Sequence, residues 1–174
     1  MRNQLVLPIT EITEVAAARR LATGLAHGLG FNETIVGKIA LVMTECATNL
    51  VKHTTKGGEL LVRSIELNGI AGIEIFALDK GPGIANVAEA MQDGYSTAGS
   101  SGTGIGAISR LSDFFDIYSA PGMGTAILTR LWATPLPANQ ETACVPGLLA
   151  LTRLAAMDAT STPAGDPNWK VSLP

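Results

Sequence analysis

Cysteine is scarce in this sequence, and the two cysteines that occur suggest no shared structural role. Cys46 and Cys144 lie far apart and match neither a disulfide framework nor the spacing of a zinc site, which favours a reducing cytoplasm. Aromatic residues are also few, at 5% of the chain against 47% for all hydrophobic residues. The core must therefore be built mainly from Leu, Ile, Val and Ala.

Basic residues form no dense stripe, and the formal net charge is -3. This balance gives little electrostatic attraction for nucleic acid or for an anionic membrane. No stretch resembles the roughly 20 apolar residues of a membrane span, and the first ten residues lack a signal-peptide pattern. The Gly-Lys-Ser/Thr sequence of a P-loop is missing as well. We therefore expect a soluble, cytoplasmic protein that binds neither nucleic acid nor membrane.

The periodic segments predict one domain, residues 1–132, followed by a linker-like tail, residues 133–174. An apolar run at 148–157 in this tail could fold back on the domain or onto a second subunit, or it could bind a partner.

Asn68 and Gly69 predict a hairpin turn. The expected strands are 3–9, 58–67, 71–79, 115–120 and 124–133; the expected helices are 10–30, 31–54 and 103–115, with a short helix after 85 and a lid-like Gly/Ser/Thr-rich loop at 94–104.

A polar row interrupts the apolar helix expected over residues 31–54. Glu45, Asn49 and His53 follow one another at steps of four, which places them on one side of a helix over about two turns. Apolar residues at core spacing occupy the neighbouring face, so the row should border the core. Taken alone, the row could be a helix flank facing water, or it could form the edge of a cleft.

Two glycine-rich motifs favour the cleft. In LDKGPGI, Asp79 ends a strand and Gly81 and Gly83 turn the chain, which suits a planar adenine whose amine donates to the carboxylate, although the motif alone could be an ordinary tight turn. In SSGTGIGAISRL, glycines run into a helix, whose free N–H groups favour phosphate. The second motif also fits a dinucleotide fingerprint. A Rossmann loop, however, directly follows the first strand, and this one lies deep in the chain.

The chain resembles the GHKL family of ATP-binding domains, which have the Bergerat fold. The resemblance comes from the order of five features: E-x-x-x-N on a helix, D-x-G-x-G after a strand, a lid, G-x-G before a helix, and GMGT in the last hairpin. The segment DGYSTAGSSGTGIGAISRLSDFFDIYS is most similar to small anti-sigma-factor serine/threonine kinases of the stressosome switch-kinase type. The resemblance covers residues 4–132. It implies a two-layer α/β (α+β) sandwich, with a mixed, mostly antiparallel sheet covered on one face by helices.

The resemblance also implies roles for individual residues. Glu45 would orient or deprotonate the attacking hydroxyl, and Asn49 would bind the Mg2+ ion that bridges the phosphates of ATP. Asp79 would hold the adenine amine, supported by Thr125. Gly81 and Gly83 would line the base pocket, and the phosphate contacts would come from Gly102, Thr103, Gly104 and Gly106. His53 could contact phosphate, or it could be a surface residue.

The resemblance implies a serine/threonine protein kinase of a bacterial partner-switching system. Its substrate would be a STAS-domain antagonist protein, and its phosphorylation would regulate a sigma factor or a phosphatase; a homodimer is a further expectation. A second hypothesis is a nucleotide-gated adaptor, in which ATP or ADP orders the lid and the ordered surface binds a partner without phosphotransfer. A third is the kinase-like front of a longer kinase and phosphatase chain.

Overall fold

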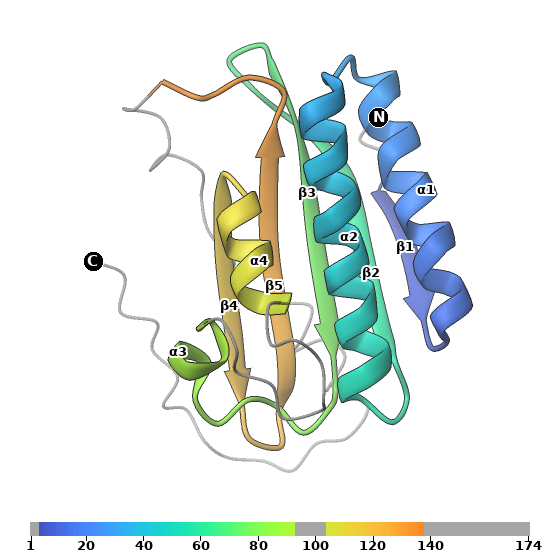
Figure 1. Cartoon of the computed structure of the whole chain (residues 1–174), viewed down its shortest axis with the longest axis vertical. Helices are drawn as coiled ribbons and strands as arrows, with labels where there is room; N and C mark the ends of the chain where they lie inside the picture. The colour runs from blue at the N-terminus through green and yellow to red at the C-terminus, as the bar shows by residue number, and fades with distance from the viewer. Residues whose placement is uncertain (1–3, 93–103, 138–174) are drawn as a thin grey trace.

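A computed structural model describes residues 4–92 and 104–137. The five strands form one sheet in the order β1-β2-β3-β5-β4 (Figure 1), and each of its four pairings is antiparallel. The sheet expected to be mixed is thus antiparallel throughout the described part. The elements are β1 (Gln4–Ile9), α1 (Ile12–Gly28), α2 (Glu33–His53), β2 (Gly58–Leu67), β3 (Ile70–Asp79), α3 (Val87–Ala90), α4 (Gly104–Leu111), β4 (Phe114–Ala120) and β5 (Gly124–Trp132).

Local sequence signals account for several of these boundaries. Asn68 and Gly69 both adopt positive φ, at 50° and 79°, as a two-residue hairpin turn requires, so the predicted turn between β2 and β3 is confirmed. Asn32 caps α2 by accepting a hydrogen bond from Ile35 N at 3.0 Å. These signals fix where the longest helix begins and how the two central strands meet.

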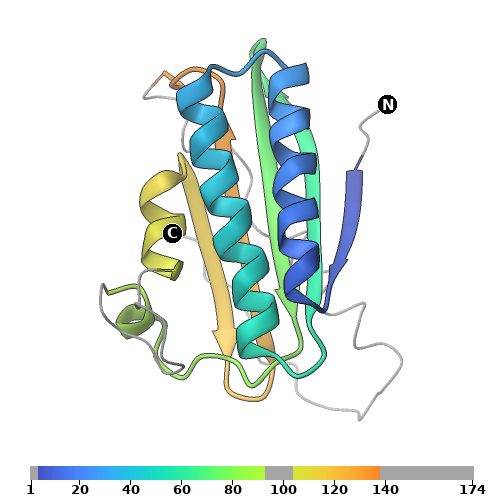
Figure 2. The same ribbon diagram turned by 45° about the vertical axis from the view of Figure 1, so that its right-hand side comes forward.

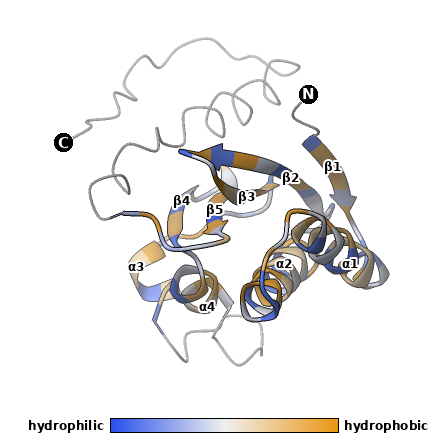
Figure 3. Cartoon of the chain, turned by 90° about the horizontal axis from the view of Figure 1, so that it is seen from above, coloured by the Kyte–Doolittle hydropathy of each residue, from blue (hydrophilic) through white to orange (hydrophobic). Residues whose placement is uncertain are grey.

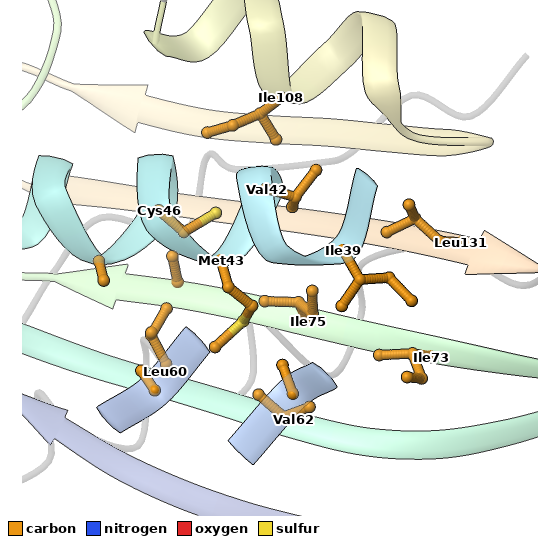
Figure 4. Packing of buried hydrophobic residues seen from close by; sticks show 14 of the residues in the cluster. Ile39, Val42, Met43, Cys46, Leu60, Val62, Ile73, Ile75, Ile108 and Leu131 are labelled. Atoms are coloured by element: carbon orange, nitrogen blue, oxygen red, sulfur yellow. The ribbon is translucent and has the colours of Figure 1, made fainter. Parts of the chain in front are cut away.

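Helices α1, α2 and α4 all lie on one side of the sheet, which makes a two-layer structure (Figures 2 and 3). The expected α/β sandwich with helices on one face is therefore confirmed. Alternate residues of the strands point into the core between the layers. There α2 contributes Ile39 and Met43, and the sheet contributes Leu60 and Ile75 (Figure 4). This packing fixes α2 against the centre of the sheet, and α2 also packs against α1 and α4 on its two sides.

The last helix is shorter than expected. We predicted a helix through Phe115, but α4 ends at Leu111 and β4 begins at Phe114. The Ser112 hydroxyl donates to Ile108 O at 2.7 Å, and Asp113 N donates to Arg130 O at 3.0 Å. Ser112 thus satisfies a carbonyl at the helix end, and Asp113 already bonds to β5. Of the expected lid loop only Gly104 belongs to the described residues, and the apolar run of the tail lies wholly outside them.

Within the described part of the chain, α2 alone is long and apolar enough to pass for a membrane span by length and composition. We expected no such stretch from the sequence. This result is weak evidence for a span, because the core helix of a folded domain passes the same test. Ile39, Val42 and Met43 of this helix are fully buried in the core.

Candidate nucleotide site

Two residues of the polar row on α2, Glu45 and Asn49, lie beside the start of α4. Glu45 and Asn49 are both half-buried, whereas His53, at the end of the helix, is exposed. A methyl group added to Gly104 would lie 3.2 Å from Glu45 Oε2 and 3.3 Å from Asn49 Oδ1. The Glu45 and Asn49 side chains therefore lie directly against the first residue of α4, and glycine allows this close contact.

Asn49 has an unusual environment. Its side-chain Nδ2 is buried and has no hydrogen-bond partner among the described residues. An unpaired buried polar group costs about 1–3 kcal/mol, so such groups mark places where a ligand or ion completes the bonding. A carboxamide beside a helix N-terminus suits both phosphate oxygens and the hydration shell of Mg2+, which prefers oxygen ligands.

Within residues 4–92 and 104–137, no group of three or more His, Cys, Asp or Glu side chains is arranged to hold a metal ion. Mg2+ at phosphate-transfer sites commonly has only one or two protein ligands and is otherwise bound by substrate phosphates and water. Asn49 beside Glu45 fits that kind of site.

Asp79 lies at the end of β3, where the chain turns. Its Oδ1 accepts a hydrogen bond from Gly81 N at 2.7 Å. Burial raises the pKa of the Asp79 carboxyl, and the backbone amides of Gly81 and Thr125 and the charge of His53 oppose this shift. The group is thus a partly desolvated carboxyl held in place by backbone amides.

The loop after Asp79, which leads from β3 to α3, lies against the end of α2. A methyl group on Gly81 would lie 3.0 Å from Thr54 Cγ2 and 3.1 Å from His53 O, so glycine allows this close contact. Asn49 and His53 are four residues apart, or about 6 Å along the helix axis. Consequently Glu45, Asn49 and the Asp79 loop border one continuous stretch along the C-terminal half of α2.

The turn between β4 and β5 packs against the same loop. Gly83 has φ +71°, and a methyl group there would collide with the Ala120 carbonyl oxygen. Gly122 N donates to Pro82 O at 2.7 Å. Glycine at position 83, which we predicted to line the base pocket, thus allows the backbone of the loop to contact the β4–β5 hairpin.

A hydroxyl pair links the two loops, and sequence reasoning had identified only one of its members. Thr125 lies between Asp79 of β3 and Ser119 of β4 in the sheet register. The Ser119 hydroxyl lies 2.9 Å from Thr125 Oγ1 and accepts a hydrogen bond from Ile84 N at 2.8 Å. Ser119 therefore positions the loop after Asp79. The cross-strand register of the last hairpin was the signal that could have identified it.

The glycine box is only partly described. Gly104 is the first residue of α4 and lies beside Glu45. Gly106 is buried, and a methyl group there would lie 2.6 Å from the carbonyl oxygen of Met91, the residue that follows α3. The other predicted residues of the box, Gly102 and Thr103, lie outside the described residues.

Comparison of the sequence with known proteins identifies its family. The sequence profile of the histidine kinase-like ATPase domain matches residues 10–130. The chain belongs to this family. It is 33% identical over 132 residues to the serine/threonine-protein kinase RsbT of Bacillus subtilis, a match that covers 76% of this chain and 98% of RsbT.

Solved structures of histidine kinases show a weaker likeness. The mycobacterial sensor histidine kinase MprB has a TM-score of 0.45 at 17% identity, covering 78% of this chain and all of that one. The catalytic domain of histidine kinase ThkA has a TM-score of 0.45 at 12% identity, covering 76% and 99%. The family assignment depends on the two sequence matches. They confirm the predicted GHKL-type resemblance, ATP binding and the enzyme class, a protein serine/threonine kinase.

Proposed function

We propose that this chain is a cytoplasmic partner-switching kinase that transfers the γ-phosphate of Mg2+-ATP to a STAS-domain antagonist protein. The phosphorylated antagonist would then change its hold on a sigma factor or a phosphatase. The observation that carries the proposal is the pair Glu45 and Asn49, half-buried and in contact range of the first residue of α4. The similarity to RsbT supports the kinase class, and the site chemistry supports the role of each residue.

Each residue has a specific role in this proposal. Glu45 accepts the proton of the attacking serine or threonine hydroxyl as the new oxygen–phosphorus bond forms and ADP leaves. Asn49 would hold Mg2+ through its side-chain oxygen, and the ion would supply charge neutralisation for the phosphates. The N-terminus of α4 at Gly104 faces the phosphates, and Asp79 accepts a hydrogen bond from the adenine amine. Thr125 supports Asp79 at the base of the pocket.

Substituting Glu45 tests the assigned base. Glu45→Ala should abolish transfer to a panel of purified STAS-domain proteins from the source bacterium, while ATP binding measured by calorimetry changes little. Glu33→Ala is the matched control, because Glu33 lies on the same helix with a side chain that is 85% exposed. A Glu45→Ala protein that transfers phosphate at the wild-type rate would contradict the role.

The nucleotide-gated adaptor makes a different prediction for the same proteins. An adaptor should bind or release its partner with a non-hydrolysable ATP analogue as well as with ATP. A kinase should require the transferable phosphate. Partner release measured with both nucleotides therefore separates the two functions.

A further inference from the structure

The face of the sheet opposite the helices is apolar at its centre. Residues of β2, β3 and β5 that point away from the core form a second cluster there, which we call the helix-free face: Leu61, Phe76, Leu78, Ala126 and Leu128. Trp132 pairs with Gly72 in the register, and a methyl group on that glycine would lie 2.5 Å from the indole, so Trp132 extends the same face.

These side chains are nevertheless buried. Leu78 is 1% exposed, Leu128 3% and Trp132 3%, although α1, α2 and α4 all lie on the other side of the sheet (Figure 3). At the edges of the sheet, Val6 of β1 and Tyr118 of β4 pair with members of this cluster, and they remain 42% and 44% exposed. The centre of the face is therefore covered within a single chain, and no described helix or strand provides the cover.

A buried ionic cluster lies on the same face and supports this conclusion. Glu74, 1% exposed, accepts from Arg130 Nε at 2.7 Å and also pairs with Arg63. Arg130 in turn lies over the Phe114 ring, 4.9 Å from its centroid. Charged groups are rarely buried at an open sheet surface, because water would solvate them there.

We infer that the part of the tail from residue 138 onward docks on the helix-free face through its apolar run at 148–157. The tail follows Pro137, shortly after β5 ends at Trp132, so it starts beside the face that needs a cover. Leu148, Leu151 and Leu154 recur at a spacing of three, which gives an apolar stripe if this run is helical. The match to RsbT covers 98% of that kinase but 76% of this chain, and the family profile ends at residue 130, so the tail lies beyond the part of the chain that matches the family.

Photo-cross-linking in the full chain tests this docking directly. The photoreactive amino acid p-benzoylphenylalanine replaces Tyr118 at the rim of the face, and in a control it replaces Leu41, which is 55% exposed on α2. We expect position 118 to cross-link to a peptide from 138–174 of the same chain, and position 41 not to do so. A cross-link between two chains, or none to the tail, would overturn the inference.

Trp132 provides a second readout that does not depend on activity. The chain has two tryptophans, so a Trp169→Phe background isolates the emission of Trp132. Leu151→Glu with Leu154→Glu should shift this emission to the red, increase acrylamide quenching and remove the cross-link from position 118. Each change should weaken docking by about tenfold or more, since it loses the burial of a leucine. Thr152→Glu is the matched control, and equal spectra for the two variants would contradict the inference.

Discussion

Asp79→Asn is the sharpest test of the adenine pocket, because it removes a charge and an acceptor while it preserves shape. One oxygen of Asp79 already accepts from Gly81 N at 2.7 Å, and an asparagine Oδ1 can accept the same bond, so the loop should keep its conformation. The other oxygen becomes an NH2 donor, which cannot accept from the adenine amine. A hydrogen bond to a charged group contributes about 1.5–3 kcal/mol, so affinity for ATP and ADP should fall by about 10- to 150-fold.

Calorimetric titration with ATP, ADP and GTP measures this effect. The wild-type protein should prefer adenine nucleotides clearly over GTP, and Asp79→Asn should lose most of that preference. Asp116→Asn makes the same chemical change at an exposed position of β4 and should bind as the wild type does. Equal affinity of wild type for ATP and GTP, or unchanged ATP binding by a folded Asp79→Asn protein, would refute the pocket.

The pH dependence of the same residue gives an independent check. Burial raises the pKa of Asp79, against the opposing effect of the Gly81 and Thr125 amides and of His53. The folded chain therefore holds this proton at pH values where the unfolded chain has lost it, so this group lowers stability as pH rises from about 4 to the raised pKa. ATP binding needs the ionised acceptor, so affinity should rise over the same window. Urea unfolding and ATP titration across this range should show these trends as the difference between wild type and Asp79→Asn, because the other carboxyl groups, such as Glu14 with its lowered pKa, titrate in both proteins.

The remaining predictions concern Gly104, Asn49 and Ser119. Gly104→Ala places a methyl group 3.3 Å from Asn49, so steady-state phosphotransfer should fall by about tenfold or more, whereas Gly37→Ala, with no atom within 4 Å, should be neutral. Asn49→Leu removes the unpaired Nδ2, so urea unfolding should show unchanged or higher stability while calorimetry shows loss of Mg2+-dependent ATP binding. Ser119→Ala leaves Ile84 N without its acceptor and should lower the free energy of unfolding by about 1–3 kcal/mol; an effect under about 0.5 kcal/mol would contradict this role.

The sequence was most informative where one residue type determines local geometry. Asn68 and Gly69 predicted the hairpin turn because few other pairs adopt two positive φ angles. Glu45 and Asn49 were placed together because helix periodicity alone puts residues four apart on one side. Both predictions depend only on residues that are close together in the chain, and the structure has both features.

Predictions that depended on distant contacts were less complete. The end of α4 at Leu111 follows from bonds of Ser112 and Asp113 with other parts of the fold, and helical spacing cannot show these. Ser119 was missed because its importance comes from the strand register, which brings it to Thr125. The close approach of Met91 to Gly106 is set by the placement of α3, which the glycine motif alone does not indicate.

The cover of the helix-free face also depends on contacts between residues that are distant in the chain. Residues 61, 76, 78 and 128 alternate with core residues along their strands, so the sequence shows apolar residues on both faces of the sheet. Such a pattern indicates a sheet covered on both sides. The sequence does not say which segment provides the second cover, and the burial of Trp132 and Glu74 within one chain is what makes the tail the best candidate.

The measurement that tests the central claim most directly is the transfer of labelled phosphate from ATP to a purified STAS-domain protein by the wild-type chain. We predict that label from the γ-position, and not from the α-position, appears on one serine or threonine of that protein, and that Glu45→Ala abolishes it while Glu33→Ala does not. If instead no STAS-domain protein is labelled, and the partner responds equally to ATP and to a non-hydrolysable analogue, the chain acts on its partner by nucleotide-gated binding and the proposed phosphotransfer is wrong.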